Sequence, residues 1–85
     1  MRVHARFRLD QVNRARNYYK APGEEQSKTV EAAHVVLNPV QGEPFGNATP
    51  SGRIDMSIVN PAAAQMFFDA QIGQEFDLFI SPVEQ

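Results

Sequence analysis

Residues 2–9 read Arg-Val-His-Ala-Arg-Phe-Arg-Leu, an uninterrupted alternation of basic and apolar side chains. Successive side chains of an extended strand point to opposite faces of a sheet, so this period of two predicts a β-strand. Its apolar face comprises Val3, Ala5, Phe7 and Leu9, and its basic face comprises Arg2, His4, Arg6 and Arg8. The apolar face is suited to a protein core. The basic row, with members about 7 Å apart, is suited to phosphates, carboxylates or acidic side chains of a neighbouring strand.

The length of 85 residues indicates a single domain spanning residues 1–85. A domain of this size buries only about 60% of the surface of its unfolded chain, so its core is thin. The sequence contains no cysteine, which excludes disulfides and, with only two histidines, a closed zinc site. We therefore expect a homo-oligomer, whose subunit contacts add buried surface, and neither a metal nor another cofactor.

Charge is unevenly distributed along the chain. Residues 1–20 carry six basic side chains against Asp10 alone, whereas the rest carry Lys28 and Arg53 against nine carboxylates. A basic ribbon on an acidic body favours a local anion site, and it disfavours bulk DNA because the acidic body repels a phosphate backbone. No apolar run reaches the length of a signal peptide or a membrane span, so we expect a cytoplasmic protein without a membrane partner.

The pattern along the chain predicts the order β-β-β-α-β. The expected strands are residues 2–12, 29–39, 53–58 and 75–81, and the expected helix is residues 61–70. Residues 13–28 are polar and contain the turn signal Ala-Pro-Gly, so they predict a loop or a protruding hairpin arm. The fold class is α+β, mostly β: a small antiparallel sheet around one short helix, or a small open barrel.

Several details of these elements can be tested. The weak alternation of residues 29–39 predicts partial burial on both faces of that strand. Asn60 followed by Pro61 predicts a helix N-cap, with Gly73 releasing the chain afterwards. The helix face expected in the core comprises Ala63, Met66, Phe67 and Ala70. Phe68 lies off this face, and we interpret it as a subunit contact.

The first candidate site is the basic row of the opening strand. Guanidinium groups match phosphate oxygens and stack on base faces, so Arg6 and Arg8 are candidate ligand-binding residues. The structural alternative is cross-strand pairing with the carboxylates at outward positions of other strands, which are Glu31, Asp55, Glu75 and Asp77.

The second candidate site is the loop 45–53, which offers hydroxyl, amide, aromatic and guanidinium groups. Its candidate ligand-binding residues are Phe45, Asn47, Thr49, Ser51 and Arg53, with Tyr19 as a further stacking residue. Thr49-Pro50-Ser51-Gly52 fits a type I turn, so a plain connection before the third strand is the alternative. The spacing matches no phosphate-binding fingerprint.

Catalysis has little support in the residues. His4 lies among arginines, His34 lies in an apolar strand, and neither Ser51 nor Ser57 has a local base. We therefore predict that the chain is not an enzyme.

Several short motifs occur in a consistent order. They are Val35-x-Leu37-x-Pro39-Val40, Ala48-Thr49-Pro50-Ser51-Gly52, Val59-Asn60-Pro61-x-Ala63-Ala64, Gly73-x-Glu75-Phe76 and Ser81-Pro82-Val83-Glu84. In these motifs and in its basic opening strand, the chain resembles a family of small accessory proteins encoded by tailed bacteriophages. It departs from that family in residues 13–28, which are longer than expected, and in residues 42–46, which lack the usual charged segment.

The resemblance implies a compact β protein that acts by binding in the cytoplasm of an infected bacterial host cell. Small oligomeric phage proteins of this kind serve as sponges for nucleotide signals of bacterial immunity. The leading hypothesis is therefore a non-catalytic binder of a small phosphorylated ligand, such as a cyclic oligonucleotide. The alternatives are a protein-interaction module, either an inhibitor of a host protein or a minor virion component, and a single-stranded nucleic-acid-binding protein.

Overall fold

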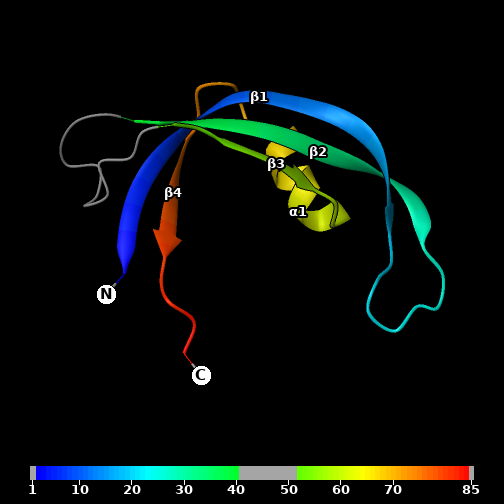
Figure 1. Cartoon of the computed structure of the whole chain (residues 1–85). Coiled ribbons are helices and arrows are strands. Elements are labelled where there is room, and N and C mark those ends of the chain that lie inside the picture. Colours follow the sequence, from blue (N-terminus) through cyan, green and yellow to red (C-terminus); the bar gives the residue numbers. More distant parts are fainter. Residues whose placement is uncertain (1, 41–51, 85) are drawn as a thin grey trace.

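The computed structural model describes residues 2–40 and 52–84. In this part of the chain, four antiparallel strands form one open sheet with one short helix, in the predicted order β-β-β-α-β (Figure 1). The elements are β1 (Val3–Tyr19), β2 (Lys28–Pro39), β3 (Ile54–Ile58), α1 (Pro61–Phe68) and β4 (Glu75–Ile80). The strand order is β3-β2-β1-β4, which leaves β3 and β4 as edges. The open sheet, not the barrel, is therefore the architecture observed.

The first two strands form a long hairpin whose far end is the predicted arm. β1 continues past residue 12, where the sequence pattern predicts its end, because residues 13–19 find backbone partners in β2, up to Tyr19 opposite Lys28. The arm closes in a turn in which Glu24 N–H donates to the Ala21 carbonyl at 3.0 Å. Gly23 takes the positive φ of 85° that the position after a turn proline demands.

A β-bulge at Asp10 divides β1 into two halves. Asp10 has no opposing residue in β2, so the alternation of faces reverses at this point. Val12 consequently points to the same face as Leu9, although they are three positions apart, and Arg14 and Arg16 follow Val12. The bulge therefore separates the arginines of the opening strand from those of the arm.

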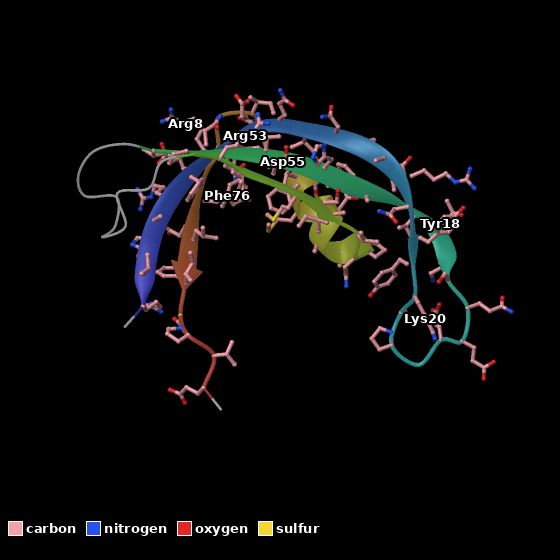
Figure 2. All side chains as sticks on the ribbon, viewed as in Figure 1. Arg8, Tyr18, Lys20, Arg53, Asp55 and Phe76 are labelled. Atoms are coloured by element: carbon pink, nitrogen blue, oxygen red, sulfur yellow. The ribbon has the colours of Figure 1, made fainter. Side chains whose placement is uncertain are left out.

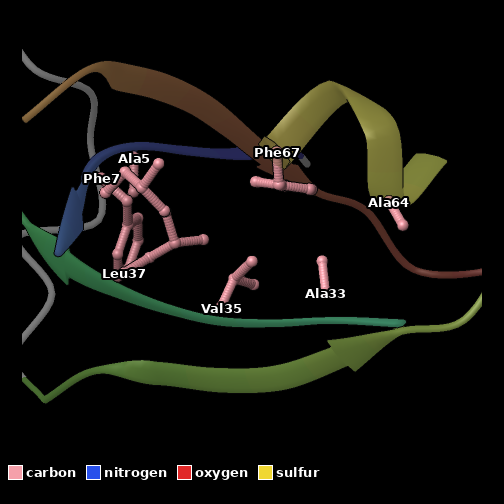
Figure 3. Packing of buried hydrophobic residues seen from close by; sticks show 8 residues of the cluster. Ala5, Phe7, Ala33, Val35, Leu37, Ala64 and Phe67 are labelled. Carbon is pink, nitrogen blue, oxygen red and sulfur yellow. The ribbon is translucent and has the colours of Figure 1, made fainter. Parts of the chain in front are cut away.

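The core lies on the face that α1 covers, which we call the inner face; the opposite one is the outer face (Figures 1 and 3). Its buried side chains are Ala5, Phe7, Leu9, Ala33, Val35, Leu37, Ala64 and Phe67. Three of the eight are alanines, so the core is thin, as expected for this length. On the outer face, Ala32 and Val36 are also buried, which confirms the prediction that β2 is covered on both sides.

The start of α1 is the predicted one. Asn60 Oδ1 accepts hydrogen bonds from the N–H groups of Ala62 and Ala63 at 3.0 and 3.4 Å, as expected of an N-cap residue. Pro61 is the first helical residue, where its missing N–H costs nothing. The helix ends at Phe68, two residues earlier than predicted.

The buried face of α1 differs in part from the predicted one. Ala64 and Phe67 are buried, whereas Ala63 is exposed and Met66 is 52% exposed, because eight residues meet the sheet along one narrow strip. Phe68 is half-buried against the core, with the Arg14 guanidinium 4.1 Å from its ring centroid. Phe68 thus contacts its own chain, and its interpretation as a subunit contact stays a prediction.

A turn after α1 places β4 beside β1. Gly73, at a φ of 96°, donates its N–H to the Leu9 carbonyl at 2.8 Å, and Leu9 N–H donates to the Gln74 carbonyl at 2.9 Å. Gly73 therefore anchors the returning chain on β1 rather than ending the helix itself. The register that follows sets Glu75 opposite Arg8.

Candidate anion-binding site on the outer face

The outer face of β1 and β4 carries a row of cross-strand ion pairs. His4 Nε2 lies 2.8 Å from Asp77 Oδ1, and Arg6 Nε lies 3.3 Å from the same oxygen. Arg8 Nη2 lies 3.2 Å from Glu75 Oε2. The basic row therefore forms cross-strand pairs with carboxylates, as the structural alternative predicted, and these carboxylates lie on β4. All of these side chains remain partly exposed, and exposed ion pairs of this kind contribute little to stability.

A second charged group lies on the outer face between β2 and β3. The His34 ring forms a short contact with Asp55 Oδ1, and Arg53 Nη2 lies 3.9 Å from Asp55 Oδ2. Because His34 holds the other oxygen of this carboxylate, Arg53 retains only a distant ion pair. Its side chain is 65% exposed.

The register of the sheet brings Arg8 and Arg53 together. Arg8 lies opposite Asn38 in β2, and the register of β3 against β2, continued by one residue from Ile54, places Arg53 on the other side of Asn38. Two strand spacings separate Arg8 from Arg53, about 10 Å between backbones. Figure 2 shows both side chains on the outer face at the same end of the sheet, with Phe76 on the opposite side. Two long cationic side chains thus flank one exposed amide.

Arg6 and Arg8 differ in how strongly they are committed to carboxylates. Arg6 contacts both Asp77 and Glu75, and its side chain is 35% exposed. Among the residues of β4, Arg8 forms an ion pair with Glu75 alone, and its side chain is 54% exposed. Arg8 is therefore better placed than Arg6 to accept an external anion.

The remaining predicted site residues do not join this pair. Tyr19 lies at the far end of β1, about 35 Å from Arg8 along the strand, where its hydroxyl accepts a hydrogen bond from Asn60 Nδ2 at 3.1 Å. One small ligand cannot contact both. Phe45, Asn47, Thr49 and Ser51 lie outside the described residues.

Sequence reasoning missed three participants in this face. Asn38 and His34 carry no charge pattern, and only the register shows that they lie beside Arg53 and Asp55. The third is Phe79, whose ring stacks on His4 with centroids 4.6 Å apart, while the Arg2 guanidinium lies 4.4 Å from the Phe79 centroid. Its outward position was readable from the alternation of β4, but its partners were not.

The arm carries a shallow groove that is separate from the Arg8–Arg53 pair. It has a volume of about 360 Å³ and is lined by Arg14, Ala15, Arg16, Thr29, Val30 and Glu31. Arg14 Nη1 lies 2.6 Å from Glu31 Oε2, so the charges of this pair neutralise each other within the groove. Arg16 is the other basic residue of the lining, so the groove holds one arginine beyond this ion pair.

Asp77 links the outer face to a pH-dependent stability. The hydrogen bond from His4, followed by the hydrogen bond and charge of Arg6, lowers the pKa of Asp77 below its ordinary value of 3.8. A carboxylate with a lowered folded-state pKa stabilises the fold fully above its ordinary pKa, and this contribution is lost as the pH falls through the lowered value. We expect Asp77→Asn to make unfolding free energy less dependent on pH below about pH 5.

Urea unfolding at a series of acidic pH values measures this effect. Asp10→Asn, at the exposed bulge, is the matched control and should retain the wild-type pH dependence. Equal slopes for Asp77→Asn and the wild type would contradict the prediction.

No protein-family model, curated protein or solved structure matches this chain. Within residues 2–40 and 52–84, no three histidine or acidic side chains are grouped as metal ligands. In the same ranges, no helix is long and apolar enough to cross a membrane.

Proposed function

We propose that this chain is a non-catalytic, phage-encoded binding protein that sequesters a small phosphorylated ligand of the cyclic oligonucleotide class. The observation that carries the proposal is the placement of Arg8 and Arg53 on either side of Asn38, on one exposed face. A phosphate accepts paired hydrogen bonds from a guanidinium, and the Asn38 amide supplies a further donor between the two cations.

The ion pairs already present leave room for such a ligand. Exposed pairs such as Arg8–Glu75 contribute little, whereas hydrogen bonds from a guanidinium to a phosphate are among the stronger polar contacts. A ligand with two phosphates gains from both arginines at once. A phosphate group can therefore displace the single carboxylate that lies beside each arginine.

A thermal unfolding experiment with a panel of cyclic di- and trinucleotides tests this function. A ligand present at 100 times its dissociation constant adds about 2.7 kcal/mol of stability, which for a domain of this size raises the melting temperature by about 10–20 °C. The matching nucleosides without phosphate are the control and should produce no shift. Absence of a shift with every cyclic nucleotide would overturn the proposal.

The alternative function, a protein-interaction module, has one specific observation in its favour. Tyr18 is 63% exposed on the protruding arm, and exposed tyrosines are frequent anchors of protein interfaces. A stoichiometric host or virion protein that binds the wild type but not Tyr18→Ala, together with an inert nucleotide panel, would favour this alternative.

A further inference from the structure

β4 is an edge strand that pairs with another strand on one side only in the described part of the chain. β4 pairs with β1 along Val3–Arg8, and among the described residues no strand lies on its other side. In such an edge, about half of the backbone N–H and C=O groups point away from the sheet without a strand partner. An open edge of this kind is a template for pairing with another strand.

The side chains around this edge are unusually exposed and apolar. No residue of β4 is buried, although Phe76 and Leu78 point to the inner face. Of the six large apolar side chains that are exposed in the described part of the chain, three lie in this short stretch: Phe79 at 51%, Ile80 at 57% and Val83 at 84%. Exposed apolar groups concentrated at one edge indicate an interaction surface.

The whole molecule also exposes more surface than a compact monomer. Its accessible area is 6235 Å², whereas a compact protein of 9.5 kDa exposes about 5,000 Å². Its radius of gyration is 15.1 Å, against about 12 Å for a compact chain of this length. A standard interface buries about 800 Å² per partner, so the excess of about 1,200 Å² is large enough to supply one subunit contact.

We propose that a second copy of this chain pairs antiparallel along β4 about a two-fold axis at Leu78. Residues directly opposite each other must share a face of the sheet. The two-fold axis must therefore pass through a residue of β4 and not between two residues. An axis at Asp77 would oppose two carboxylates, and one at Phe79 would pair only residues 78–80 of β4, because the strand ends at Ile80. The axis at Leu78 avoids both faults.

The Leu78 register gives the dimer a continuous inner face. Phe76 of each copy lies opposite Ile80 of the other, and the two Leu78 side chains meet at the axis. Asp77 lies opposite Phe79, so no like charges face each other directly. The apolar stripe of β4 thereby continues from one subunit into the next.

The mass in solution and its response to edge substitutions test this proposal. The wild type is expected to show twice the monomer mass of 9.5 kDa in light scattering at micromolar concentration. Ile80→Lys should raise the dimer dissociation constant by about tenfold or more, because a lysine at the edge disfavours strand pairing. Tyr18→Lys, equally exposed but on the arm, is the matched control and should remain a dimer.

A crosslinking experiment checks the register without depending on a destabilising charge. The chain has no cysteine, so Leu78→Cys introduces a single thiol at the proposed axis. A short thiol-reactive crosslinker should convert this variant to a covalent dimer, and it should leave Tyr18→Cys monomeric on a denaturing gel. A monomeric wild type, or crosslinking through Tyr18→Cys alone, would overturn the proposal.

The dimer interface and the nucleotide site can be tested independently of each other. Arg8 and Arg53 do not belong to the β4 edge, so the Arg8→Ala, Arg53→Ala double variant should remain a dimer. A dimer without nucleotide affinity would refute the proposed function only, and a nucleotide-binding monomer would refute the interface only.

Discussion

Replacing Arg8 and Arg53 together with alanine is expected to weaken binding of a cyclic oligonucleotide by about 100-fold or more. A hydrogen bond to a charged group contributes about 1.5–3 kcal/mol, and two such bonds correspond to at least two orders of magnitude in the dissociation constant. Both side chains are more than half exposed, so neither is required for the core. Isothermal titration calorimetry with the best ligand of the panel measures the loss.

Arg16→Ala is the matched control for the double variant. It removes the same kind of side chain from the same strand, but beyond the bulge, on the inner face of the arm. Its affinity should stay within about twofold of the wild type, since long-range effects of one exposed charge are screened at physiological salt. Equal losses in Arg16→Ala and the double variant would indicate binding through net charge and contradict a site at Arg8 and Arg53.

Leu9→Ala is expected to lower the free energy of unfolding by about 2–5 kcal/mol. Leu9 is 1% exposed, and within residues 2–40 and 52–84 Leu9 and Val35 are the largest side chains that are fully buried. Truncation would remove apolar contacts and leave a cavity beside Leu37, in a core with few large residues to fill it. Urea unfolding followed by circular dichroism at neutral pH measures this change.

Ile72→Ala is the matched control for core truncation. Ile72 is 64% exposed in the turn after α1, so its truncation should change the free energy of unfolding by no more than about 0.5 kcal/mol. A comparable loss in both variants would show that the inner face depends on the turn as much as on Leu9.

Much of the fold was predictable because its signals are local. The alternation of residues 2–9, the Asn60-Pro61 helix start and the glycine turn of the arm each depend on neighbours in sequence. The element order and the α+β class follow from these signals. The buried face of α1 was predicted only in part, since Met66 satisfies the helical period yet lies beyond the strip that contacts the sheet.

The candidate site was predictable in its residue types and not in its arrangement. Arg6, Arg8 and Arg53 were identified from their charge, and carboxylates of other strands were the expected competitors. Their pairing depends on long-range register: Asp77 reaches Arg6 across 71 positions of the chain. Charge periodicity alone cannot show that His34 occupies one oxygen of Asp55 and thereby leaves Arg53 weakly held.

The sequence by itself determined which face of each strand is apolar, because alternation is a property of the extended backbone. It also determined that the opening strand presents a row of cations. Only the tertiary structure decided which cations remain available, because the bulge at Asp10 turns the arginines of the arm to the inner face. The strand order then brings Arg8 and Arg53 to either side of Asn38, and strand order depends on contacts between segments distant in the chain.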